Sequence, residues 1–230
     1  MEITSRSFVL VVVFLLCIET SYCRYYTREV KKSLQNPLRY GETDIVFVLD
    51  TSGRVGGYNF GREVTFVRNL LNKINVYMDG AQVSLIRYGN DVDVLIHQIG
   101  CWPGSSKCEL LPALSRVSYT GGSSNMGAAL QKARELFESS RPGAKKVLVL
   151  LTDGHSDGNE NPDHQATLLK ATGVEIFTIG IGSYDYSELQ SIASPPYAGV
   201  HVYPYNNFND FNGLVLQIRG GEMFINCKDA

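Results

Sequence analysis

Two apolar runs of the chain end in the same way, and this repeated pattern constrains the fold more than any other feature. Residues 44–50, DIVFVLD, and residues 145–154, KKVLVLLTDG, each contain five consecutive apolar positions, followed directly or after one threonine by an aspartate. A continuous apolar run is typical of a strand that other structure covers on both faces. We therefore expect both runs to form inner strands of a sheet.

The remaining segments alternate between strand and helix patterns. Residues 59–74 carry apolar side chains at helical spacing, and residues 126–140 form a second amphipathic pattern. The pair Gly89-Asn90 is typical of a hairpin turn, which predicts that residues 81–88 and 91–99 are antiparallel strands. We expect further helices at residues 163–173, 186–194 and 208–220, and further strands at residues 174–182 and 199–205.

This alternation predicts the α/β class. The expected fold is a doubly wound, mostly parallel sheet with one antiparallel edge strand and helices on both faces. A length of 230 residues suits one domain with short extensions. We expect the domain at residues 43–220, preceded by a lead-in at residues 24–42 and followed by a tail at residues 221–230.

The first 23 residues have the pattern of a signal peptide. Arg6 precedes an apolar run at residues 8–18, and small residues lie shortly before Cys23, near which we expect cleavage. The alternative is an uncleaved membrane anchor, for which the run is short. The pattern therefore predicts a secreted, extracellular protein, and the later sequence contains no apolar stretch long enough for a membrane span.

Charge and motif patterns argue against two function classes. A formal net charge of −2 provides no basic surface for nucleic acid. His155 lies close to Asp153 and Ser156, but neighbouring residues on one loop do not supply the geometry of a hydrolase triad. Since no pair of groups has a defined acid–base or nucleophile role, we expect no enzyme activity.

The cysteines fit an oxidising compartment. Cys101 and Cys108 lie close together in the loop CWPGSSKC, which predicts a local disulfide. Cys227 is left over, and it can pair with Cys23, pair with another chain or stay free. Trp102, beside Cys101, is a candidate for contact with a partner, and the alternative is that its ring covers the loop.

Polar residues follow the apolar runs and converge on one edge of the predicted sheet. Asp50 and Ser52 follow the first run, Asp153 ends the second, and the loop YTGGSSNMG at residues 119–127 precedes a helix. Ligands of such sheets bind beyond the carboxyl ends of the strands. Two carboxylates with several hydroxyls suit Mg²⁺ or Ca²⁺. The sequence therefore predicts a cation site at this edge.

Three segments together resemble the motif blocks of the von Willebrand factor type A domain family. They are DIVFVLDTSGRVGGYNFGREVTFVRNLL, YTGGSSNMGAAL and KVLVLLTDGHSDG, and the resemblance covers residues 43–220. It implies a metal-ion-dependent adhesion site in which a divalent cation also binds an acidic residue of the partner. The implied metal ligands are Asp50, Ser52, Ser124 and Asp153, with Ser123 as the alternative to Ser124.

Arg54 departs from that site pattern, because it stands where a third hydroxyl is expected. If Arg54 points inward, its guanidinium pairs with the two aspartates in place of a metal. If it points outward, the site loses one hydroxyl ligand, which water can replace. In both cases its positive charge weakens cation binding.

These observations leave two functional interpretations. The first is a secreted adhesion module that binds a matrix or cell-surface protein through this edge, using Arg54, Trp102 and a weakened site for Mg²⁺ or Ca²⁺. The second is a metal-independent structural matrix module, disulfide-linked to another chain through Cys227.

Overall fold

The structure is a computed structural model that describes residues 42–77, 79–100 and 107–218. The predicted signal peptide, the C-terminal tail and the residues Cys23, Cys101, Trp102 and Cys227 lie outside this part of the chain. Within the described ranges, no helix has the length and apolar character needed to cross a membrane.

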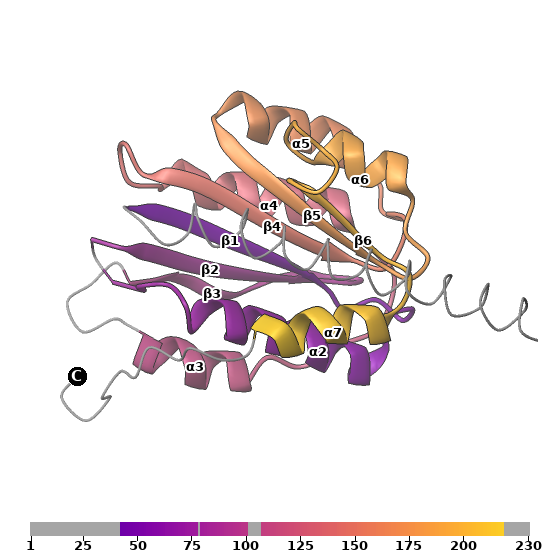
Figure 1. Ribbon diagram of the computed structural model, residues 1–230. Helices are drawn as coiled ribbons and strands as arrows, with labels where there is room; N and C mark the ends of the chain where they lie inside the picture. The colour runs from indigo at the N-terminus through magenta and orange to yellow at the C-terminus, as the bar shows by residue number, and fades with distance from the viewer. Residues whose placement is uncertain (1–41, 78, 101–106, 219–230) are drawn as a thin grey trace, which may run out of the picture.

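Six strands form one sheet in the order β3-β2-β1-β4-β5-β6 (Figure 1). All neighbouring pairs are parallel except β2 and β3, which are antiparallel. The predicted mostly parallel sheet with one antiparallel edge strand is confirmed. The strands are β1 (Thr43–Asp50), β2 (Ala81–Tyr88), β3 (Val92–Ile99), β4 (Lys145–Thr152), β5 (Val174–Ile181) and β6 (Val202–Tyr205).

Helices cover both faces of this sheet (Figure 1). On one face lie α2 (Gly56–Leu71), α3 (Lys107–Ser115) and α7 (Phe208–Ile218), and on the other lie α4 (Met126–Glu138), α5 (Pro162–Ala171) and α6 (Tyr186–Ile192). Helix α3 was not predicted from the sequence. It is short, contains Pro112 and follows the predicted disulfide loop. Cys108 in α3 is disulfide-bonded, and its pairing with Cys101 stays a prediction.

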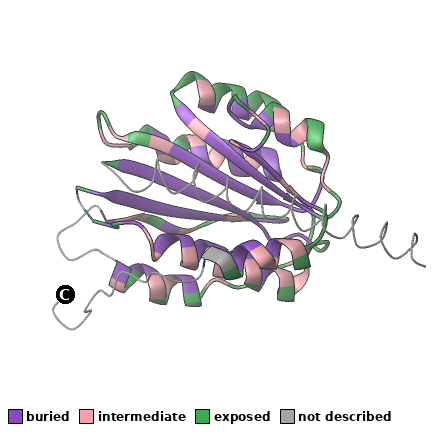
Figure 2. Cartoon of the chain, in the orientation of Figure 1, coloured by how far each residue is buried: buried purple, intermediate pink, exposed green. Residues whose placement is uncertain are grey.

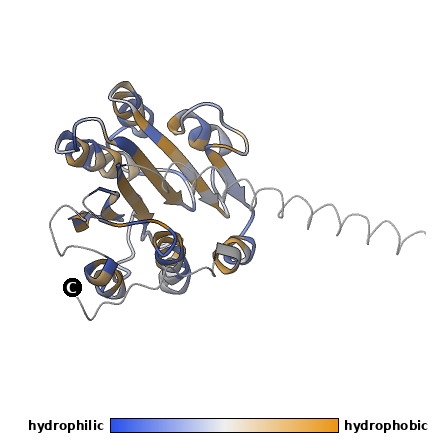
Figure 3. Ribbon diagram, turned by 60° about the vertical axis from the view of Figure 1, so that its left-hand side comes forward, coloured by the Kyte–Doolittle hydropathy of each residue, from blue (hydrophilic) through white to orange (hydrophobic). Residues whose placement is uncertain are grey.

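The position of β1 at the centre of the sheet explains the continuous apolar run in its sequence. All eight of its residues are buried (Figure 2). Ile45, Phe47 and Leu49 belong to the core beneath α2, whereas Val46 and Val48 belong to the core beneath α4. Both faces of the strand therefore need apolar side chains, and the inner strands form a hydrophobic band between the helical layers (Figure 3).

The strand order reverses beside the central strand β1. From β1 the chain continues to β2 and β3 on one side, and β4, β5 and β6 then extend on the other. The order thus reverses between β1 and β4, and ligands of open α/β sheets bind at such a reversal, beyond the carboxyl ends of the strands. Asp50 ends β1, and Asp153 directly follows the neighbouring strand β4.

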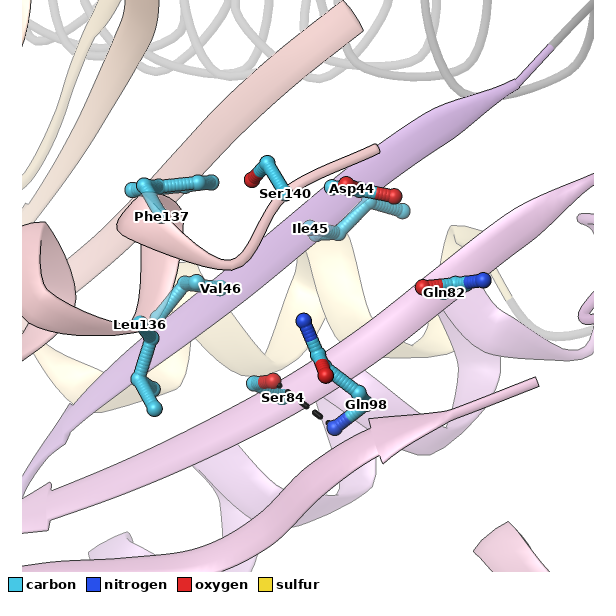
Figure 4. A pocket seen from close by; sticks show the side chains of 9 residues that line it. All are labelled: Asp44, Ile45, Val46, Gln82, Ser84, Gln98, Leu136, Phe137 and Ser140. Carbon is cyan, nitrogen blue, oxygen red and sulfur yellow. Dashed lines mark hydrogen bonds between the residues drawn. The ribbon is translucent and has the colours of Figure 1, made fainter. Parts of the chain in front are cut away.

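The opposite, amino edge of the sheet has a structural polar cluster. Asp44 forms an ion pair with Arg141, whose Nε and Nη2 both donate to Asp44 Oδ1, at 2.8 and 2.6 Å. Nearby, a cavity of about 10 Å³ is lined by Asp44, Ser84 and Gln98 among others, and the backbone N–H of Gln98 donates to Ser84 Oγ at 3.0 Å (Figure 4). That volume has room for about one water molecule, so the cavity is too small for a ligand.

Removing the Arg141 side chain should destabilise the fold, because it leaves the buried carboxylate of Asp44 without its cation. We expect Arg141→Ala to lower the free energy of unfolding by about 3 kcal/mol, measured by urea denaturation. The control Lys132→Ala breaks an exposed pair with Glu135 and should cost less than about 1 kcal/mol. Equal losses in the two variants would contradict this role of the ion pair.

Candidate ion site at the carboxyl edge of the sheet

Asp50 is the centre of the predicted site and is fully buried. Its Oδ1 accepts a hydrogen bond from the amide of Ser52 at 2.8 Å. Its Oδ2 accepts from the hydroxyls of Tyr88 and Thr152, both at 3.1 Å, and of Ser124 at 3.4 Å. Burial and the nearby charge of Asp50 raise the pKa of Tyr88, so that this hydroxyl remains a donor. Asp50 thus connects residues from β1, β2, β4 and the loop before α4.

The structure distinguishes between the two serines of that loop. Ser124 is fully buried and faces Asp50, whereas the amide and hydroxyl of Ser123 donate to Asn90 Oδ1 at 2.7 and 3.0 Å. Asp157, which the sequence analysis did not single out, fixes the position of Ser124. Its carboxylate accepts from the Ser124 amide, and its own amide donates to the Ser124 carbonyl at 2.9 Å.

Glycine is required where the loops approach each other. Gly122 has a φ of +99° and accepts a hydrogen bond from the Gly53 amide at 2.8 Å. A Cβ on Gly122 would lie 2.4 Å from Asn90 Oδ1, so a larger residue would both strain the backbone and displace Asn90. The glycines of the loop therefore bring Ser124 to Asp50.

Arg54 turns toward Asp153. Its Nε lies 3.5 Å from Asp153 Oδ1, and its Nη2 donates to the carbonyl of His155 at 2.7 Å. The contact with the carboxylate is long and involves one nitrogen, unlike a bidentate pair. The Arg54 side chain remains 45% exposed, and none of its described hydrogen bonds reaches Asp50.

Asp153 is poorly compensated by this contact. The residue is 5% exposed. Burial and the negative charge of Asp50 raise its pKa to about 6, although the guanidinium of Arg54 acts in the opposite direction. The site therefore has an excess of negative charge even with Arg54 in place.

Glu63 is a third carboxylate that the sequence analysis did not identify. It lies on the buried face of α2 between Phe60 and Val67, it is fully buried, and neither carboxylate oxygen has a hydrogen-bond partner among the described residues. Burial raises its pKa well above the usual value, and the charges of Asp50 and Asp153 raise it further. Its only sequence signal is its position within an apolar helical stripe.

The oxygen atoms at this edge fit a hard cation. Besides the two aspartates, the Ser52 hydroxyl is 2% exposed and has no described hydrogen-bond partner, as expected of an atom available to a ligand. Within the described ranges, no three Asp, Glu, His or Cys side chains lie close enough to hold an ion together. Direct ligands would therefore be Asp50, Asp153, the serine hydroxyls and water.

The histidine beside this site does not form a hydrolase triad. Nδ1 of His155 lies 3.0 Å from Glu188, and the Ser156 hydroxyl donates to the carbonyl of Ser124. The described contacts thus direct each group away from Asp153.

An open α/β sheet with three loops around a buried aspartate defines a class of ligand-binding domain, and sequence comparison places the chain within one family. Residues 44–217 match the von Willebrand factor type A domain, and the chain belongs to this family. The resemblance of the three motif blocks is therefore confirmed.

Individual relatives share the domain but are far longer proteins. The chain is 34% identical over 178 residues to the sushi, von Willebrand factor type A, EGF and pentraxin domain-containing protein 1 of Mus musculus, covering 76% of this chain and 5% of the relative. It is 30% identical over 176 residues to the collagen alpha-5(VI) chain of Mus musculus, covering 75% of this chain and 6% of the relative.

A solved structure is similar in fold as well. It is proximal thread matrix protein 1 from the mussel byssus, with a zinc-occupied metal-ion-dependent adhesion site motif. The TM-score is 0.68 at 28% identity, and the match covers 77% of this chain and 45% of that one. The family fold is therefore compatible with a divalent cation at this motif.

The raised pKa of Glu63 predicts a pH dependence of stability. The folded protein keeps a proton that the unfolded chain loses above about pH 4.5, so its stabilising contribution is complete below that pH and declines as the pH rises toward the folded pKa. We expect wild type to lose stability relative to Glu63→Gln as the pH rises above about 4.5, measured by urea denaturation with EDTA. A constant difference between the two proteins would refute this. The exposed Glu138→Gln serves as the control variant.

Proposed function

We propose that this domain is a secreted extracellular binding module that engages a matrix or cell-surface protein through the carboxyl edge of its sheet. The convergence of three loops on the buried Asp50 carries the proposal, since it builds a shaped, polar surface at the strand-order reversal. Support for the extracellular setting comes from the predicted signal peptide and from relatives that include a collagen chain and a thread matrix protein.

The same edge offers a weakened site for Mg²⁺ or Ca²⁺. Asp50, Ser52, Ser124 and Asp153 would hold the ion directly or through water. A bound cation would supply a coordination position for an acidic group of the partner. Arg54 opposes this binding, because its guanidinium already pairs with Asp153 and stands where a further hydroxyl ligand would lie.

That ion pair also supports the alternative, a metal-independent module. In this case Arg54 serves as the permanent counter-charge of Asp153, and the surface binds its partner without an ion. Covalent linkage of such a module through Cys227 is part of this second proposal.

Exposed side chains at the start of α2 offer contacts next to Arg54. Tyr58 is 79% exposed, and the Arg62 guanidinium lies 4.6 Å from the centre of its ring. Tyrosine and arginine are enriched among residues that dominate protein–protein binding. We place Tyr58 and Arg54 in the partner-binding surface. Trp102, outside the described residues, stays a separate candidate for contact with a partner.

Isothermal titration with Mg²⁺, Ca²⁺ and Mn²⁺ tests the ion site. We expect wild type to bind with a Kd of about 1 mM or weaker, and Arg54→Ser to bind at least about tenfold more tightly, because the change removes a positive charge and restores a hydroxyl. Arg62→Ser is the matched control and should bind like wild type. Equal binding by wild type and Arg54→Ser would show that Arg54 has no influence on the ion.

Binding to immobilised decellularised connective-tissue matrix tests the partner surface. We expect Tyr58→Asp to weaken binding at least about tenfold, because it replaces an exposed aromatic contact. Leu216→Asp changes another exposed apolar residue near the far end of α7 and should leave binding unchanged. If both variants bind as wild type does, the carboxyl edge is not the partner surface.

A further inference from the structure

A groove lies along one side of α2, outside the candidate ion site. Helix α3 lies beside α2 (Figure 1), and the groove between them has a volume of about 270 Å³. On the α2 side it is lined at helical spacing by residues between Gly57 and Arg68, and on the other side by residues between Leu114 and Tyr119. This volume is just below the about 300–1,000 Å³ of typical small-molecule pockets, and it suits side chains of a bound segment.

The floor of the groove is apolar. Phe60, Val64 and Leu114 line it and are at most 7% exposed. Tyr119 forms part of the wall, and its position is fixed from two sides. Its ring centre lies 6.2 Å from that of Phe60, and its hydroxyl donates to the carbonyl of Ser52 at 3.3 Å. An apolar floor with a fixed aromatic wall suits an apolar side chain of a partner.

Gly61 leaves the groove open. It lies inside α2 and also lines the groove, and a Cβ at this position would meet no heavy atom within 4 Å. Its φ is not in the positive range, so the backbone does not require glycine here. Glycine inside a helix lowers stability relative to alanine. Neither backbone geometry nor packing therefore accounts for Gly61, whereas a larger side chain would extend into the groove.

Positive charge lies beside the apolar floor. Of the lining residues that the structure describes, Arg68 alone is charged, and its Nη2 donates to Ser115 Oγ at 3.3 Å. Arg116 follows Ser115 and is exposed. Neither arginine has an ion-pair partner in the described part of the chain. The carboxylates of the two helices do not line the groove, because Glu63 is buried in the core and Glu109 lies in the first turn of α3.

We propose that this groove binds a peptide segment of a partner protein in which an apolar side chain lies next to Asp or Glu. The apolar side chain packs over Phe60 and Val64, and the carboxylate pairs with Arg68. A sulfated polysaccharide would match the charge but has no apolar side chain for the floor, so the groove favours a peptide.

This surface goes beyond the carboxyl edge and needs no ion. The two surfaces are nevertheless contiguous, because Tyr119 contacts both. Its hydroxyl reaches Ser52, and its ring lies 3.4 Å from the position of a Cβ on Gly57, which precedes the exposed Tyr58. One extended partner can therefore contact the edge and the groove together.

Selection from a phage-displayed library of random peptides tests the inference, with the full chain immobilised in EDTA. We expect the selected peptides to contain an apolar residue next to Asp or Glu. By fluorescence anisotropy of the synthetic peptides, Gly61→Leu should weaken binding at least about tenfold, because its side chain fills the groove. Gly61→Ala adds only a Cβ and should change the affinity less than about threefold. Melting temperatures of both variants at or above that of wild type would show that the fold is retained.

Charge reversal tests the role of Arg68 without filling the groove. Arg68→Glu should weaken binding of the same peptides at least about tenfold. Lys132→Glu makes the same change of net charge on α4, on the other face of the sheet, and should change the affinity less than about threefold.

The remaining outcomes would overturn the inference. Selection of no peptide, or of peptides that bind Gly61→Leu as well as wild type, would exclude the groove as a peptide site. Peptides without acidic residues, or unaffected by Arg68→Glu, would refute the charge match. Heparin is the polysaccharide probe, and heparin binding to both wild type and Gly61→Leu without any selected peptide would replace the peptide by a polyanion. The ion titration and the Tyr58→Asp comparison measure the proposed function separately.

Discussion

The arrangement of the loops at the carboxyl edge of the sheet depends on the hydrogen bonds to the buried carboxylate of Asp50. It ends the central strand β1 and receives hydrogen bonds from Ser52, Tyr88, Ser124 and Thr152. These donors come from separate parts of the chain, so one charged group determines how the loops meet. A buried charge is tolerated because each of its oxygens is satisfied. The same hydrogen bonds join the loop after β1 and the loop before α4 to β2 and β4.

Two other buried carboxylates have fewer partners than Asp50 has. Asp153 has a single long contact with Arg54, and Glu63 has no described partner. Burial raises the pKa of both groups, and the negative charge of the neighbouring carboxylates raises it further. The site therefore combines a rigid part, which positions the loops, with an electrostatically unsaturated part, which is suited to a cation.

Much of the architecture could be predicted from the sequence, because the continuous apolar runs reflect strands covered on two faces. The strand-end position of Asp50 and Asp153 followed from the same runs. The burial of Glu63 could not be predicted, since a charged residue inside an apolar stripe looks like an exception to the helix pattern. The choice between Ser123 and Ser124 depended on the contact with Asn90, which exists only after the chain has folded. The helix α3 was missed because its sequence contains a proline and no clear apolar period.

If the proposed site binds an ion, the contact between Arg54 and Asp153 makes the guanidinium an intramolecular competitor of that ion. Because Arg54 is attached to the chain, its local concentration does not change when the protein or the medium is diluted. The apparent affinity for an ion is then the intrinsic affinity reduced by the fraction of molecules in which the arginine has moved away. The position of one long side chain would thus set a threshold ion concentration, below which the domain behaves as though it had no ion site.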